Sequence, residues 1–280
     1  MATLSNQVMS SNGHRRTSAS GHLEFGGFTL MELLVVIAII CVLAALLLSA
    51  LNRVKQRGQG TACLSNLRQV QAAWGLYADD FQQRLVLNRG MFRTNPDNPF
   101  DTWAAGNVDG LPDETNALLL AKSLLGPYVK NCAVYKCPAD PGNPPGTPRV
   151  RSISMNNYMG GIGMLIYSND FVYNARLADI RRPASAFVFL DERASTINDG
   201  YFVVDLTTNY RLAQPNDMPA NYHVKAGNLS FSDGHAETKR WQSPLFTSPP
   251  TRRPFGSASN NPDYIWLMKN TTVPVESDWP

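Results

Sequence analysis

A run of apolar residues near the N-terminus is the most marked feature of the chain. Residues 28–50 form a stretch of 23 residues with one charged side chain, Glu32. A helix of that length, at about 1.5 Å per residue, measures roughly 35 Å and exceeds a bilayer core of about 30 Å. The pattern predicts a transmembrane helix over residues 28–51 and argues against a purely soluble cytosolic protein.

Apolar positions then recur at helical spacing. The steps of three or four residues predict an amphipathic helix over residues 52–81 that packs on a sheet. Gly58 and Gly60 weaken a helix and predict a bend or a melted turn before the stripe. The stripe consists of Cys63, Leu67, Val70, Trp74, Tyr77 and Phe81.

The pattern changes to that of strands in the C-terminal half. Continuous apolar runs at residues 186–190 and 200–205 predict buried strands. Alternating residues on both sides of Asp233-Gly234 predict a two-residue hairpin, because this pair tolerates the positive φ angles of a tight turn. In that register, the core face carries Phe231 and Ala236, and the other face carries Ser230, Ser232, His235 and Glu237.

These patterns together predict an α+β fold, in which a long N-terminal helix packs on a C-terminal antiparallel β-sheet. Residues 82–242 form the expected globular domain, which includes a short helix at residues 116–125. The Pro-, Ser- and Asn-rich residues 243–280 are expected to be an irregular tail.

Charge changes this picture little. The chain has 25 Lys and Arg against 22 Asp and Glu, a net charge of +3. So small an excess gives no whole-chain electrostatic attraction to nucleic acid, and we expect no nucleic-acid partner.

The N-terminus does carry a specific signal. Residues 1–27 are polar and contain the basic pair Arg15 and Arg16, and residues 27–32 read Gly-Phe-Thr-Leu-Met-Glu. The combination of a basic leader, a glycine before the apolar run and a lone early acid resembles the cleavage and methylation signal of type IV prepilins and type II secretion pseudopilins. The spacing of His223 and, ten positions later, Asp233-Gly234 is similar to a C-terminal signature of pseudopilin-like proteins.

The resemblance implies processing and assembly. Prepilin peptidase would cut between Gly27 and Phe28 and N-methylate Phe28, leaving residues 1–27 as a cytoplasmic leader peptide. Glu32 would become the fifth mature residue and pair with the amino group of a neighbouring subunit. An ionised carboxylate in hydrocarbon needs such a partner, because burying it unpaired costs several kcal/mol.

The implied function is that of a structural subunit in a pseudopilus or pilus for protein secretion, and not that of an enzyme. Its expected location is the bacterial inner membrane, as a single-pass protein with a cytoplasmic N-terminus and a periplasmic domain. The expected partners are prepilin peptidase, other pseudopilin subunits, a secretion assembly platform and inner-membrane lipid. The alternative is a membrane-anchored periplasmic binding or adhesion module that uses exposed aromatic residues: Trp103, Tyr158, Tyr167 and Trp241.

The cysteines outside the apolar run number three. In an oxidising compartment, we expect one disulfide and one free thiol. Cys63 with Cys137 is the favoured pair, and Cys132 with Cys137 is the local alternative. The Cys-x4-Cys spacing has no second well-spaced pair, which argues against a zinc site.

The sequence offers candidate ligands for calcium, and the alternative is an acidic loop that is simply solvated. Four oxygen-bearing residues fall in one short segment, and oxygen ligands suit Ca²⁺, although the spacing is not that of an EF-hand. The resemblance supports this, because major pseudopilins bind Ca²⁺ in a C-terminal loop. The candidate ligands are Asp191, Glu192, Asn198 and Asp199.

Motifs for nucleophilic, metalloprotease or phosphate-loop chemistry do not occur in the sequence. His223 is expected to be structural, bonding either the backbone or Asp233 across the hairpin turn. An envelope hydrolase that uses His223 and Asp233 is the remaining catalytic hypothesis.

Overall fold

In a computed structural model of the whole chain, the structure describes residues 29–90, 97–110, 112–160, 170–206, 215–249, 258 and 260–276. The chain divides into two compact units, Met1–Leu48 and Ser49–Pro280. Helix α1 (Leu30–Asp80) begins in the first unit and ends in the second. The predicted cleavage site at Gly27 and Phe28 lies outside the described residues.

Helix α1 is a single element, so the two predicted helices are continuous along the chain. The expected melted turn at Gly58 and Gly60 is wrong, because both residues are helical, while the alternative of a bend stays a prediction. The predicted amphipathic stripe is buried from Cys63 to Tyr77. Phe81 lies just past the helix end, where it is 47% exposed and stacks on Tyr77 with ring centroids 4.3 Å apart.

A five-stranded sheet forms the centre of the second unit, in the order β3-β1-β2-β4-β5. Three neighbouring pairs are antiparallel, whereas β1 and β3 are parallel. The sheet is therefore mixed, which corrects the expected antiparallel sheet. The strands are β1 (Ile153–Asn156), β2 (Phe187–Asp191), β3 (Tyr201–Phe202), β4 (Ala226–Phe231) and β5 (Ala236–Arg240).

The β4–β5 hairpin exists, but its register differs from the predicted one. Phe231 N–H donates to the His235 carbonyl and Gly234 N–H donates to the Phe231 carbonyl, which leaves a three-residue loop that ends on Gly234 with φ of +96°. A shift of one residue reverses every side chain between the faces of a strand. Ser230 therefore lies opposite Ala236, and the ring of Phe231 stacks on His235 at 4.3 Å.

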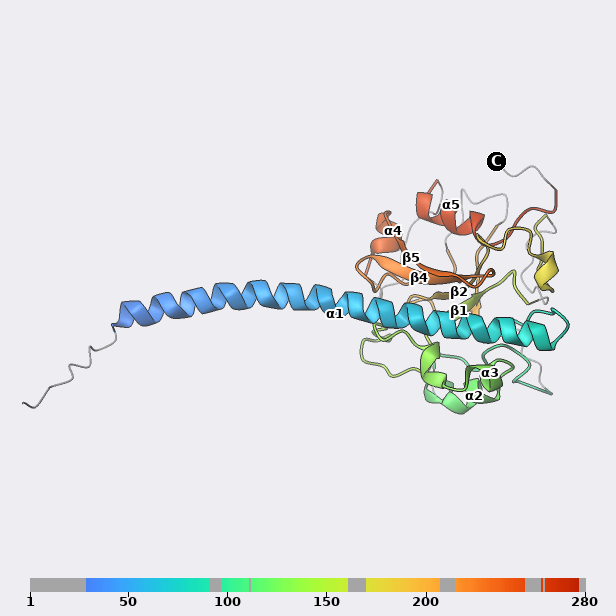
Figure 1. Cartoon of the computed structure of the whole chain (residues 1–280), viewed down its shortest axis with the longest axis horizontal. Coiled ribbons are helices and arrows are strands. Elements are labelled where there is room, and N and C mark those ends of the chain that lie inside the picture. The colour runs from blue at the N-terminus through green and yellow to red at the C-terminus, as the bar shows by residue number, and fades with distance from the viewer. Residues whose placement is uncertain are drawn as a thin grey trace, which may run out of the picture. The chain divides into compact units, whose positions relative to one another are not determined.

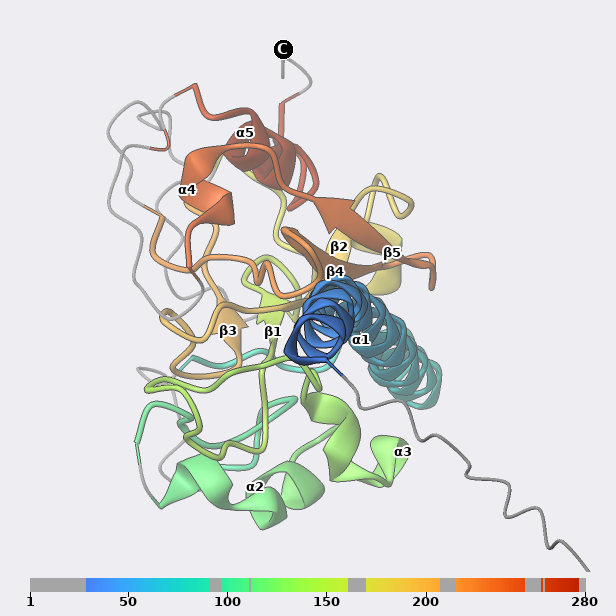
Figure 2. The same ribbon diagram turned by 90° about the vertical axis from the view of Figure 1, so that its left-hand side faces the viewer.

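The two faces of the sheet are covered by different elements (Figures 1 and 2). The part of α1 after residue 48, together with α2 and α3, covers one face, and α4 and α5 cover the other. A bulge between Phe187 and Phe189 lets the adjacent residues Val188 and Phe189 enter the α1-side core. Phe187 and Leu190 enter the core on the opposite face.

The remaining helices are short. Asn116 caps α2 (Ala117–Lys122) by accepting a hydrogen bond from the backbone of Leu118. The predicted helix at residues 116–125 ends earlier, at Lys122. A second short helix, α3 (Gly126–Val129), begins just after the expected end. Three-residue and four-residue 3₁₀ helices span Asp113–Thr115, Cys132–Tyr135 and Leu177–Asp179.

The expected irregular tail contains two helices, α4 (Pro244–Thr247) and α5 (Pro262–Lys269). Asn261 caps α5 by accepting hydrogen bonds from two backbone N–H groups, and a proline follows at the first helical position. Tyr264, Leu267 and Met268 are buried in the core on this face of the sheet. Part of the tail is therefore integral to the fold.

Candidate functional site

Four reactive side chains from distant parts of the sequence meet at the α1-side edge of the core. Cys63 comes from α1, Cys137 from the loop after a 3₁₀ helix, Asp191 from the end of β2 and His223 from the turn before β4. One ligand atom of each lies within 4.8 Å of all the others. In the part of the chain that the structure describes, no other group of three or more His, Cys, Asp or Glu side chains gathers in this way.

The contacts within this cluster are direct. The Cys63 thiol donates to Oδ2 of Asp191 at 2.7 Å. Nε2 of His223 lies 3.4 Å from Sγ of Cys137 and 3.6 Å from the same Asp191 oxygen. All four residues are buried, and the most exposed of them, His223, is 7% exposed.

The local structure explains how Cys137 and His223 reach this place. The Cys137 N–H donates to Oγ of Ser152 at 2.7 Å, which ties the loop to the start of the sheet. The His223 N–H donates to the carbonyl of Ala226, and the two intervening residues have positive φ angles of 58° and 62°. This tight turn points the imidazole towards α1.

Gly60 makes room for that imidazole. A Cβ atom at this position would lie 3.2 Å from Cγ and 3.3 Å from Nδ1 of His223. By contrast, nothing lies within 4 Å of the corresponding position at Gly58. The glycine that was expected to break the helix therefore allows a close approach between the helix and the cluster.

Burial and the neighbouring groups shift the pKa values in the cluster. Burial, the contact with Cys137 and the charge of Asp191 raise the pKa of Cys63 well above its ordinary value. Burial opposes ionisation of Cys137, but hydrogen bonds with Cys63 and His223 outweigh it and lower the pKa. Burial disfavours the imidazolium, yet the contacts with Asp191 and Cys137 raise the pKa of His223 to about 9.

The cluster does not have the geometry of a nucleophilic triad. In such a triad, the base meets the nucleophile through one ring nitrogen and the orienting carboxylate through the other. Here Cys137 and Asp191 both approach Nε2 of His223, while Nδ1 has no hydrogen-bond partner among the described residues. Two thiols, one imidazole and one carboxylate instead form a donor set suited to a zinc-type divalent cation.

The structure brings together the favoured cysteine pair. Cys63 and Cys137 are neighbours in the cluster, and both are free thiols in this structure. Cys132 lies apart from them, with its thiol 3.6 Å from the carbonyl of Ala117. The disulfide stays a prediction, but its long-range version is the one whose thiols lie close together.

The proposed calcium ligands do not form one group. Asp191 belongs to the cluster described above, whereas Oδ1 of Asp199 accepts from Tyr201 N–H and the Asn198 side chain accepts from Asp199 N–H. Glu192 is buried, and burial together with the charge of Asp217 raises its pKa well above the ordinary value. Calcium binding by these residues stays a prediction.

Glu192 itself has unusual surroundings. The hydroxyls of Ser154 and Thr196 lie near its carboxyl group, but they donate to backbone carbonyls instead, each at 3.3 Å. Neither carboxyl oxygen has a well-formed hydrogen bond with the described residues. Burial without such bonds favours the neutral form of this carboxyl group.

The expected pair of His223 and Asp233 is wrong. Asp233 bonds His235 at 2.6 Å in the hairpin loop, because the three-residue loop brings these two side chains together. The His223 imidazole faces Asp191 and Cys137 instead, and only the backbone N–H of this residue bonds to a carbonyl, that of Ala226. A hydrolase site built on His223 and Asp233 has no basis in this arrangement.

Three of the four aromatic residues suggested as a binding surface are not available for that role. Trp103, Tyr158 and Trp241 are buried, and Tyr167 lies outside the described residues. The indole N–H groups of Trp103 and Trp241 donate to the carbonyls of Gly200 and Ala220. These tryptophans are core residues with satisfied polar ends.

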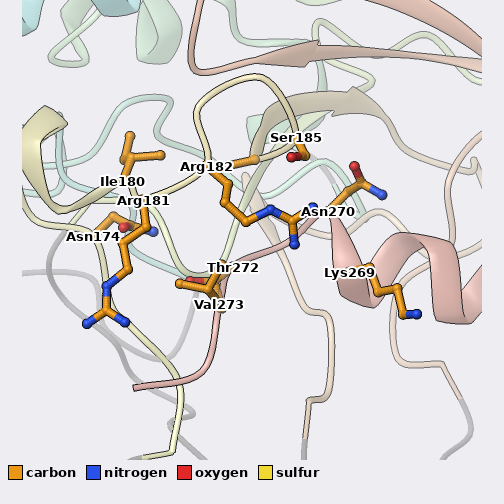
Figure 3. Close-up of a pocket in the computed structure, with 10 residues that line it drawn as sticks. Asn174, Ile180, Arg181, Arg182, Ser185, Lys269, Asn270, Thr272 and Val273 are labelled. Carbon is orange, nitrogen blue, oxygen red and sulfur yellow. The ribbon is translucent and has the colours of Figure 1, made fainter. Parts of the chain in front are cut away.

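A second candidate region lies beside the start of β2 (Figure 3). Arg181, Arg182 and Lys269 surround a hollow of about 10 Å³, which holds roughly one water molecule. Arg181 also donates to the carbonyls of Pro274 and Val275. The same three cations also line a neighbouring, more open hollow of about 290 Å³, and Glu276 on its lining partly offsets their charge.

Glu32 has a local role that the sequence analysis missed. The backbone N–H and the hydroxyl of Thr29 donate to its Oε2 at 2.8 and 2.9 Å, and its own N–H donates to Oγ1 of Thr29 at 3.2 Å. This reciprocal arrangement is a capping box at the start of α1. The spacing of threonine and glutamate by three residues was the signal that identifies it.

By length and composition, α1 is apolar enough to cross a membrane, a property that signal sequences near an N-terminus share. The described residues contain one such helix. No protein-family model, curated protein or solved structure matches the chain.

Proposed function

We propose that the protein is a pilin-like structural subunit, anchored in a membrane by the first part of α1 and assembled through that helix into a pseudopilus or pilus. The supporting observation is the exposure of the apolar stretch. The large apolar side chains from Leu30 to Val54 are between 44% and 86% exposed, on every side of the helix. A helix that is apolar all round requires lipid or other helices around it.

Glu32 gives this proposal its specificity. It is the one charged residue in the apolar stretch, and Thr29 is its one hydrogen-bond partner among the described residues. Capping explains an acid at this position in an isolated helix, whereas packing among like helices requires a compensating positive charge. The amino group of a processed neighbouring subunit supplies such a charge.

Two variants separate the capping role from the charge-pairing role. Glu32→Gln keeps an oxygen that accepts from Thr29 but removes the negative charge. Thr29→Ala removes the hydroxyl but keeps the charge. We expect Glu32→Gln to be processed and folded normally but to be lost from sheared or cross-linked fibres, whereas Thr29→Ala assembles.

Assembly of Glu32→Gln at the wild-type level would contradict charge pairing and favour a simple membrane anchor. The processing step is tested by the intact mass and N-terminal sequence of the membrane-extracted protein, from cells with and without prepilin peptidase. The expected product begins at N-methylated Phe28 and is seen only when the peptidase is present. An uncut chain in both strains would contradict the proposal.

A further inference from the structure

We propose that Cys63, Cys137, Asp191 and His223 form a tetrahedral site for one zinc-type divalent cation. This inference rests on the second unit of the chain and is independent of any role in fibre assembly. All four residues lie in the described part of the structure and converge within the core.

The donor chemistry selects the class of metal. Two thiolates and one imidazole favour borderline-soft ions such as Zn²⁺, whereas Ca²⁺ and Mg²⁺ prefer oxygen ligands. A carboxylate completes the four ligands that structural zinc sites usually have. Asp191 is thus better placed for this site than for the calcium loop suggested by the sequence.

The distances fit a four-coordinate site. Metal–ligand bonds of about 2.3 Å to sulfur and about 2.0–2.2 Å to nitrogen and oxygen give tetrahedral edges of about 3.3–3.8 Å. The Cys137–His223 and His223–Asp191 distances, 3.4 and 3.6 Å, already correspond to such edges. The Cys63–Asp191 distance of 2.7 Å is that of a hydrogen bond, and it opens when the metal replaces the thiol proton.

Two atoms of the cluster have surroundings that favour a bound cation. Oδ1 of Asp191 is buried and makes no hydrogen bond within the described residues, which leaves its carboxylate incompletely compensated. The Ala139 N–H points at Sγ of Cys137 at 3.4 Å, a contact that favours a thiolate on that sulfur. A bound cation would compensate both groups.

The site is structural in character. Catalytic zinc keeps one coordination position open to water or substrate, whereas here four protein ligands are available and all are buried. The four ligands come from α1, the loop after the Cys132–Tyr135 3₁₀ helix, the end of β2 and the turn before β4. A metal would therefore clamp the long helix to the sheet and to the middle of the chain.

A disulfide between Cys63 and Cys137 is the competing arrangement. It uses the same two thiols but gives no role to the convergence of His223 and Asp191 on them. The metal gives all four residues a role. The two arrangements also exclude each other, because an oxidised pair supplies no thiolates.

The first experiment therefore determines the state of the thiols and the metal content together. The full-length chain is extracted in detergent from its native membrane, alkylated at once under denaturing conditions and analysed by mass spectrometry. A second portion is analysed for metals without chelator. We expect four alkylated cysteines and one zinc per chain, whereas a Cys63–Cys137 disulfide would overturn the proposal.

Cobalt then reports the geometry. The full-length protein is stripped with a chelator and titrated with Co²⁺ under reducing conditions. We expect one equivalent to produce thiolate-to-cobalt charge transfer and the visible bands of a tetrahedral ion, both reversed by Zn²⁺. An octahedral spectrum without thiolate absorption would overturn the proposal even if every variant failed to fold.

Variants assign the ligands. Cys137→Ser and His223→Ala are expected to weaken Co²⁺ binding by more than about a hundredfold, the upper range for loss of an outer-shell partner. Cys132→Ser is the matched control, since its thiol lies outside the cluster. Loss of binding in Cys132→Ser, or full retention in Cys137→Ser, would contradict the assignment.

Discussion

The two parts of helix α1 differ although they belong to one continuous element. The large apolar side chains from Leu30 to Val54 are exposed on all sides, and Gly60 is the first buried residue among the helix positions whose burial is described. From Cys63 onwards, most large apolar residues occupy one face that is buried against the sheet, and Leu76 lies outside that face. The same backbone geometry thus serves two environments, and the distribution of apolar residues around the helix distinguishes them.

An apolar side chain therefore has a different role in each part of α1. In the second part, a leucine stabilises the fold of its own chain through burial. In the first part, the leucines are exposed in the folded chain, and our proposal places lipid or other helices around them. The following predictions test this distinction.

The largest expected effect comes from truncating matched leucines. Leu67→Ala leaves a cavity under the sheet and should lower the free energy of unfolding by about 2–5 kcal/mol. Leu43→Ala, in the exposed part, should change it by less than about 0.5 kcal/mol. Denaturant unfolding of the detergent-solubilised proteins measures both, and equal effects would contradict the comparison.

A charge tests the environment of the first part. Ile40 is 57% exposed and Leu76, in the second part, is 54% exposed. We expect Ile40→Asp to disfavour membrane insertion by about 3 kcal/mol, because the proposed span places this position in the hydrocarbon. Leu76→Asp should leave insertion unchanged, because its exposed side chain faces water. Carbonate extraction of membranes measures the integral fraction, and similar extraction of both variants would refute a spanning helix.

The smallest effect locates the boundary between the two parts. Gly58→Ala should stabilise the protein by up to about 1 kcal/mol, because alanine favours a helix and the added methyl group meets no atom. Gly60→Ala gains the same propensity but crowds His223, so its net effect should be less favourable. Thermal unfolding compares the pair. Equal stabilisation would contradict the close contact between Gly60 and the His223 side chain.

Local patterns predicted much of this fold. The helical spacing from Cys63 to Tyr77 identified the buried face, and the apolar run at residues 186–190 identified β2. The hairpin was located correctly, but its register depended on loop length, which one glycine at positive φ decides. The parallel pairing of β1 with β3 depends on contacts far along the chain, which no local pattern contains.

The cluster was harder to foresee than the fold. Sequence spacing argued against zinc because the ligands of most small zinc sites come in closely spaced pairs. Here the four ligands are separated by long stretches of chain and meet only through the packing of α1 on the sheet. Cys63 and Cys137 were identified as neighbours, but the addition of Asp191 and His223 required the tertiary structure.

The order of these four residues along the chain has a consequence for biogenesis. A chain synthesised from its N-terminus presents the Cys63 thiol well before Cys137, Asp191 and His223 exist. Cys132 emerges shortly before Cys137, so the first cysteine made after Cys63 is one that the native cluster does not contain. In the folded chain, the Cys132 thiol contacts the carbonyl of Ala117 instead. The native cluster therefore assembles only if Cys63 remains a free thiol until the other three residues have been made.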